Sequence, residues 1–154
     1  MKRTDEPTTV GWREWASLPA LGIPAIKVKV DTGALTSTLH AIHVRLLRDN
    51  GRLRVRFEVH PLQRRSDVTC CCIADLVGER LVTSSTGHRE KRPVIRTRIS
   101  LGTQTWPVDI TLTNRDSMGF RMLLGRRAMR GHMLVDPGRS YVLGDTHARD
   151  YEPV

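Results

Sequence analysis

The stretch Ile26-Lys27-Val28-Lys29-Val30-Asp31-Thr32-Gly33-Ala34 decides how the rest of the sequence is interpreted. Apolar and basic residues alternate from Ile26 to Val30, and a period of two is typical of a strand with one buried face. The strand ends at Asp31, where Thr32 can fix a turn through its hydroxyl and Gly33 allows close backbone approach. The pattern predicts a carboxylate presented at the end of a buried strand. An ordinary structural turn explains the same three residues.

A second segment, Phe120-Arg121-Met122-Leu123-Leu124-Gly125-Arg126, is an apolar strand that ends in Gly and Arg. A short helix is predicted directly after it, from about Arg126 to Arg130, with Gly131 at its end. No longer window carries apolar residues at helical spacing. This is therefore the one helix that the sequence predicts.

Alternating runs elsewhere predict hairpins. Residues 53–59 alternate after Asn50-Gly51, a dipeptide suited to the positive φ angles of a tight turn, and residues 42–47 are the expected partner strand. Two further runs flank Gly102, and Pro107 suggests that the second of them lies partly at a sheet edge. Many short strands with regular turns predict an all-β fold, either a barrel or a sandwich.

The length of 154 residues suits a single domain. We expect this domain to span residues 10–144, between disordered polar tails at residues 1–9 and 145–154. Aromatic residues make up only 5% of the chain, so the core must be built from Val, Ile, Leu and Met.

Together the two segments resemble one lobe of a retropepsin-like aspartic peptidase, in which an apolar-apolar-Gly segment lies beside the Asp-Thr-Gly loop and a following Arg opens a helix. The wider sequence is similar to a bacterial family named ATP-dependent zinc proteases, now grouped with retropepsin-like folds. One departure is Leu35, which stands where the family usually has a basic residue, so substrate preference near the loop stays open. The similarity rests on Gly11–Trp15, Leu18–Pro19, Leu21–Pro24, Lys29–Ala34, Thr36–Ser37, Leu39–Ala41, Arg92–Ile95, Thr111–Arg115 and Met122–Arg126, and extends to about Tyr141.

The resemblance implies a closed all-β barrel and an aspartic endopeptidase that acts on a peptide or protein. Such enzymes need two carboxylates that share a proton, one acting as base toward water and the other polarising the scissile carbonyl. Because the sequence holds a single Asp-Thr-Gly, the implied active form is a homodimer with two Asp31 carboxylates. Each Thr32 would brace the partner's loop, and Gly33 would leave room for water and substrate.

Further residues are candidates for substrate binding. Arginines suit acidic side chains, and a polar hairpin tip at residues 84–88 is the candidate mobile cover of the substrate. Solvated ion pairs and an ordinary loop explain the same residues. The candidates are Ala34, Arg115, Arg121, Arg126, Ser85 and Gly87.

No cofactor or metal is predicted. The sequence lacks both the two-His helical motif of metalloproteases and a phosphate-cradling Gly loop for ATP. His40 and His43 would face opposite ways in a strand, while Cys70 and Cys72 could share a face but have no paired cluster downstream. A zinc-dependent peptidase and a non-catalytic peptide-binding module on the same fold are the two alternative hypotheses.

The net charge indicates which kinds of binding partner are expected. Twenty-five Lys and Arg against 16 Asp and Glu give a net charge of +9, which attracts acidic molecules. With the family's association with ATP-grasp ligases that add glutamate to proteins, this charge suggests a glutamate-rich substrate. The basic residues follow no recognition motif, so nucleic acid is not an expected partner. We expect no membrane segment or secretory signal, and three adjacent thiols cannot link distant parts of the chain, which together favour the cytoplasm.

Overall fold

The computed structural model describes residues 6–62, 67–83, 86–114 and 119–144. Within these ranges the chain is mostly β-structure, with a 3-10 turn at Pro19–Leu21 and one short helix, α1, at Arg126–Met129. No helix in this part of the chain has the length and apolar character needed to cross a membrane. The strands are β1 Thr8–Val10, β2 Arg13–Leu18, β3 Ile23–Val30, β4 Ser37–His40, β5 Ile42–Asp49, β6 Arg52–Val59, β7 Cys70–Thr83, β8 Arg89–Leu101, β9 Gln104–Thr113, β10 Met122–Leu124 and β11 Met133–Val135.

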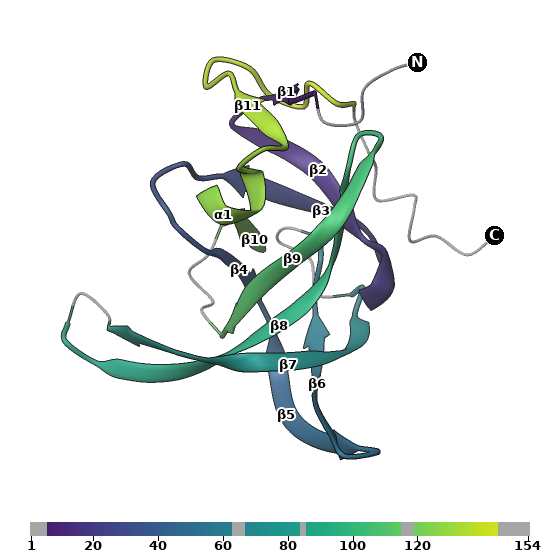
Figure 1. Cartoon of the computed structure of the whole chain (residues 1–154), viewed down its shortest axis with the longest axis vertical. Helices are drawn as coiled ribbons and strands as arrows, with labels where there is room; N and C mark the ends of the chain where they lie inside the picture. Colours follow the sequence, from purple (N-terminus) through teal and green to yellow (C-terminus); the bar gives the residue numbers. More distant parts are fainter. Residues whose placement is uncertain (1–5, 63–66, 84–85, 115–118, 145–154) are drawn as a thin grey trace.

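The main sheet closes on itself. Its order begins β2-β3-β10-β4-β9-β8, and Ser17 of β2 pairs with Ser100 of β8 to join the two ends. Beyond β8 the same sheet continues through β7, β6 and β5, which extend away from the barrel (Figure 1). The predicted all-β closed barrel with one short helix is therefore confirmed.

Both predicted hairpins form. The turn between β5 and β6 uses Asn50 and Gly51, with φ angles of 50° and 81°, and Gly102 between β8 and β9 has φ of 60°. Strand β4 pairs with β9 only from Ile110 to Thr113, so Pro107 has a partner strand on one side alone. Because proline has no backbone N–H, its placement on the side without a partner strand costs no sheet hydrogen bond.

The interior is largely aliphatic, as the composition predicts, with Phe57 and Trp106 as buried aromatic residues. Along β3, Val28 is fully buried whereas Lys29 is exposed, which confirms the alternation in the sequence. The same inward face is supplied across the barrel by residues such as Ile99 of β8, Ile110 of β9 and Leu124 of β10, all fully buried. All of the described strands except β5 therefore contribute buried apolar residues to one core.

The predicted N-terminal tail of residues 1–9 is wrong at its inner end. Thr8 and Thr9 belong to β1, which pairs in parallel with β11, and Val10 is fully buried. The N–H of Thr8 donates to the carbonyl of His132 at 3.0 Å. Composition misses this strand because its partner lies near the other end of the chain. The predicted tail at residues 145–154 lies outside the described residues.

A buried carboxylate joins the two ends of the domain. Glu14 of β2 is fully buried, and its Oε2 accepts hydrogen bonds from the N–H groups of Gly11 at 2.7 Å and Val142 at 2.9 Å. Its Oε1 accepts from the N–H of Leu143 at 3.1 Å. A buried carboxylate is tolerated only when its oxygens are hydrogen-bonded. Glu14 therefore holds the final turn of the domain against the start of β2.

We expect Glu14→Gln to lower the free energy of unfolding by about 1–3 kcal/mol, because the amide nitrogen cannot accept and would face a backbone N–H. Urea denaturation measures the loss. The control is Glu79→Gln on exposed β7, which should change stability by less than about 0.5 kcal/mol. Equal stability of both variants would show that the three hydrogen bonds contribute nothing.

Candidate active site

The Asp-Thr-Gly loop is positioned by a strand inserted from late in the sequence. Strand β10 lies between β3 and β4, parallel to β3 and antiparallel to β4. Leu124, the last residue of β10, is in register with Val30, the last residue of β3. The N–H of Asp31 then donates to the carbonyl of Leu124 at 2.9 Å. The loop therefore begins on a backbone that is fixed on both sides.

The loop folds around the Asp31 carboxylate. Oδ1 of Asp31 accepts a hydrogen bond from the N–H of Gly33 at 3.0 Å, and the Asp31 carbonyl accepts from the N–H of Ala34 at 3.2 Å. Within the described residues, Oδ2 accepts no hydrogen bond. Asp31 is half-buried, whereas Thr32 and Gly33 are exposed. The arrangement holds one carboxylate oxygen and leaves the other open to a water or a second carboxyl group.

Helix α1 is attached to this loop by its first turn. The N–H groups of Arg126 and Arg127 donate to the carbonyls of Ala34 at 2.8 Å and Leu35 at 3.1 Å. The guanidinium of Arg126 also donates from Nη1 to the carbonyl of Thr32 at 3.1 Å. Arg126, which the sequence suggested as a substrate contact, thus holds the loop's backbone. Its side chain is a positioning group.

The chain just after β10 crosses the chain just after the Asp-Thr-Gly loop at a point with no room for a side chain. A Cβ on Gly125 would lie 2.5 Å from both the carbonyl carbon and the carbonyl oxygen of Thr36. The N–H of Gly125 donates to Oγ of the buried Ser37 at 3.0 Å. Sequence reasoning found the Gly but missed the role of Ser37, whose signal was its place in the Thr36-Ser37 segment that the resemblance includes.

The remaining predicted substrate contacts lie in different parts of the fold, and only Ala34 belongs to the Asp-Thr-Gly loop. Ala34 is half-buried. Arg121 precedes β10 and so lies at the strand end opposite to the one that adjoins Asp31. Gly87 is exposed, with φ of 83°, in the connection of the β7–β8 hairpin. Arg115 and Ser85 lie outside the described residues.

A cavity of about 470 Å³ begins directly after the loop. Thr36, Ser37 and the α1 residue Arg127 form one wall, and strands β7, β8 and β9 form the other, with Arg80 and Arg96 among their residues. Figure 1 shows α1 and the β3–β4 connection on the same side of the barrel as the outer part of the β7–β8 hairpin. Sequence reasoning missed these three arginines because the sheet register and the attachment of α1 to the loop bring them together.

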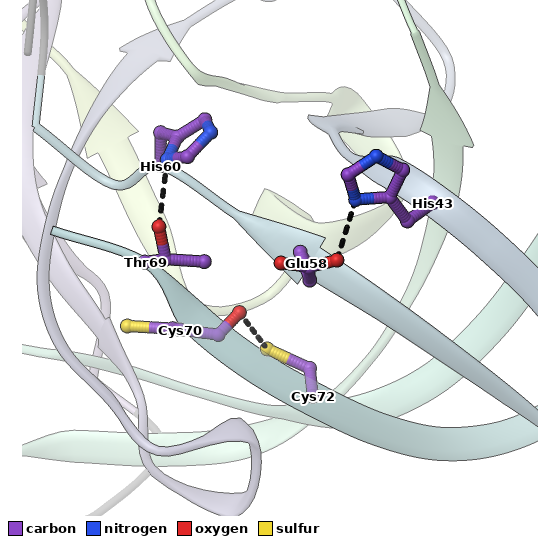
Figure 2. Close-up of polar contacts among 6 residues, drawn as sticks. All are labelled: His43, Glu58, His60, Thr69, Cys70 and Cys72. Carbon is purple, nitrogen blue, oxygen red and sulfur yellow. Dashed lines mark hydrogen bonds and ion pairs between the residues drawn. The ribbon is translucent and has the colours of Figure 1, made fainter. Parts of the chain in front are cut away.

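The histidines and cysteines considered for zinc make other contacts. His43 Nδ1 lies 2.5 Å from Glu58 Oε2 (Figure 2). His60, which the sequence did not suggest as a ligand, has its Nδ1 3.2 Å from the hydroxyl of Thr69. Burial raises the pKa of the Cys72 thiol to about 12, with smaller contributions from Cys70 and Cys71, whereas zinc binds the thiolate. Among the described residues, no three or more His, Cys, Asp or Glu side chains form a group that could hold a metal ion.

The closed barrel, the inserted β10 and the Asp-Thr-Gly loop define a retropepsin-like fold. A family model described as RimB-like, retropepsin-like aspartic endopeptidase RimB, matches residues 9–146. Because this match covers most of the sequence, the chain belongs to the RimB-like family. The family resemblance seen in the sequence is thereby confirmed.

Longer proteins share the same region. The chain is 48% identical over 142 residues to a probable alpha-L-glutamate ligase of Shewanella pealeana, covering 92% of this chain and 31% of that protein. It is 52% identical over 137 residues to a protein of the same name from Parasynechococcus marenigrum, covering 88% and 29%. This chain thus spans under a third of the length of these relatives.

A solved structure has the same fold. It is the crystal structure of a Legionella pneumophila protein of unknown function, with a TM-score of 0.75 and 27% sequence identity. The similarity covers 90% of this chain and 99% of that one. The same fold therefore occurs in a second protein, over nearly the whole of its solved chain.

Replacing Gly125 by Ala should destabilise the fold by about 2 kcal/mol or more, because the new methyl group would overlap the Thr36 backbone. The control is Gly78→Ala, since a Cβ at Gly78 meets nothing within 4 Å. Thermal and urea unfolding of both variants measure the difference. A Gly125→Ala protein as stable as Gly78→Ala would mean that the crossing is not tightly packed.

Proposed function

We propose that this protein is an aspartic endopeptidase whose active form is a homodimer, with one Asp31 from each protomer. The observation that supports it best is the placement of Asp31, a carboxylate at the end of a core strand with one oxygen held by Gly33 and the other unbonded within the described residues. A single chain supplies one such carboxylate. A twofold axis beside the loop would supply the second.

The chemistry of the pair follows from its electrostatics. Two carboxylates in one site cannot both ionise, so they share one proton. The ionised carboxylate takes a proton from water as that water attacks the scissile carbonyl carbon, and the protonated one polarises the carbonyl oxygen. The resulting tetrahedral intermediate then breaks its C–N bond as a proton passes to the leaving nitrogen. No metal or covalent enzyme intermediate enters this mechanism.

The exposed tip of the loop suits such a dimer. Thr32 and Gly33 are the exposed members of the loop, and the Thr32 carbonyl is already engaged by Arg126. The Thr32 hydroxyl is therefore the group offered to a partner loop. Two such loops braced against each other would fix the separation of the two carboxylates, which a shared proton requires.

A glutamate-rich protein is the proposed substrate. The chain carries a charge of +9, and the similar regions in Shewanella pealeana and Parasynechococcus marenigrum are parts of proteins named probable alpha-L-glutamate ligases. We infer that a peptidase related to one region of such proteins acts on chains to which glutamate has been added. Electrostatic attraction raises the local concentration of such acidic segments.

Asp31→Asn should abolish hydrolysis of a fluorogenic glutamate-rich peptide while leaving the fold and the dimer intact, because an amide cannot share the proton. The chain offers a matched control in Asp136→Asn, since Oδ1 of Asp136 accepts from the N–H of Gly138 at 3.1 Å in the same type of turn. Turnover that survives Asp31→Asn would remove Asp31 from the mechanism. Activity that is lost with EDTA and restored by zinc would favour the metal-dependent alternative.

Mixing wild-type and Asp31→Asn protomers tests the dimer directly. After subunit exchange in equal amounts, about a quarter of the dimers hold two Asp31 residues, so activity should fall to about a quarter of that of the same total amount of wild-type protein. Chains that act independently would retain about half. Sedimentation at the assay concentration confirms that dimers are present in the mixture.

A further inference from the structure

The cavity beside the loop holds three arginines but only one of them is neutralised. Arg96 of β8 donates to Asp109 of β9 from Nε at 2.8 Å and from Nη2 at 3.2 Å, a bidentate pair between neighbouring strands. The pair occupies both oxygens of the carboxylate. Asp109 is the acidic residue among those lining the cavity.

The other two arginines retain their charge for a ligand. Arg80 lies on β7 and Arg127 on α1, on separate walls of the cavity. Neither side chain has an acidic partner among the described residues. Both are exposed, so their guanidinium groups can adjust to a ligand. Two cations on independent elements that line one cavity can bind one carboxylate through charge-assisted hydrogen bonds.

The remaining lining is suited to an aliphatic stem. Val94, Pro107, Val108 and Ala128 contribute apolar atoms to the cavity. The volume of about 470 Å³ lies in the range of sites for small ligands, so the cavity has room for a side chain. A ligand with methylene groups behind a carboxylate, such as a glutamate side chain, matches both parts of the cavity.

Helix α1 gives the cavity a fixed relation to the reacting carboxylate. Its two consecutive arginines have different tasks, because Arg126 holds the Thr32 carbonyl while Arg127 faces the cavity. The Arg127 N–H donates to the Leu35 carbonyl at 3.1 Å. A side chain bound by Arg127 would therefore be held at a constant offset from Asp31.

We propose that this cavity is the specificity subsite of the peptidase, in which Arg127 and Arg80 bind the carboxylate of one substrate glutamate near the scissile bond. The inference rests on the proposed function for its reaction but makes a separate claim about binding. Arg127 is the residue on which selectivity for glutamate depends most, because it is tied to the loop through α1.

The test measures binding in the Asp31→Asn background, where cleavage does not interfere. Fluorescence anisotropy compares a labelled glutamate peptide with the matched peptide carrying glutamine at the same positions. Adding Arg127→Gln should reduce the ratio of the two affinities about tenfold, the usual effect of losing one charge-assisted hydrogen bond. Arg80→Gln should reduce it in the same direction, and Arg127→Lys should retain part of it.

Arg130→Gln is the matched control, because it removes the same charge from the exposed end of the same helix segment outside the cavity. It should change the ratio by less than about twofold, and raised salt should abolish that change through screening. An equal loss in Arg127→Gln and Arg130→Gln, or no loss in Arg127→Gln, would overturn the subsite. Hydrolysis by the protein with Asp31 intact is measured separately, so failure of the subsite and failure of the peptidase proposal give different results.

Discussion

The close crossing of Gly125 over the Thr36 backbone is the constraint on which the site depends. Two segments far apart in the sequence must meet there at a distance that excludes any side chain. Only then does β10 fit between β3 and β4 and present the Leu124 carbonyl to the Asp31 N–H. A loop tied only to its own strand would be free to move. The inserted strand converts it into part of the barrel wall.

The same crossing sets the position of α1 and of the cavity. The helix begins one residue after Gly125, and its first two N–H groups are used on carbonyls of the loop. With the helix attached in this way, the guanidinium of Arg126 contacts the Thr32 carbonyl of the loop. The next residue, Arg127, lines the cavity instead. Four helical residues thus connect the Asp-Thr-Gly loop to the cavity.

Local patterns predicted the features that depend on local physics. The alternation in β3, the Asn50-Gly51 turn and the Gly at the end of β10 each follow from periodicity or from a backbone requirement visible in a few residues. The resemblance supplied the pairing of the two distant segments. Strand β1 and the hydrogen bonds of Glu14 with Val142 and Leu143 were not predictable, because their partners lie near the other end of the chain and carry no compositional signal.

The arginines were also difficult to assign from sequence. The 25 Lys and Arg residues spread over the whole chain, and some of their charges are compensated locally, as in the pairs Arg52–Asp75 and Arg96–Asp109. Exposed pairs of this kind contribute little to stability, yet they determine which cations remain for a ligand. The sheet register decides which arginines are paired. Arg96 of β8 faces Asp109 of β9, while Arg80 has no such partner among the described residues.

Symmetry adds a final restriction on the substrate. In a homodimer each protomer would contribute an identical cavity, so two equivalent carboxylate sites would flank the pair of Asp31 residues on opposite sides. A peptide has a direction and presents different residues to the two sides. A peptide tract of one residue type can fill both equivalent sites, because each cavity then receives the same side chain. In the proposed homodimer, a uniform glutamate segment would therefore fit the two cavities better than a sequence with a single acidic residue.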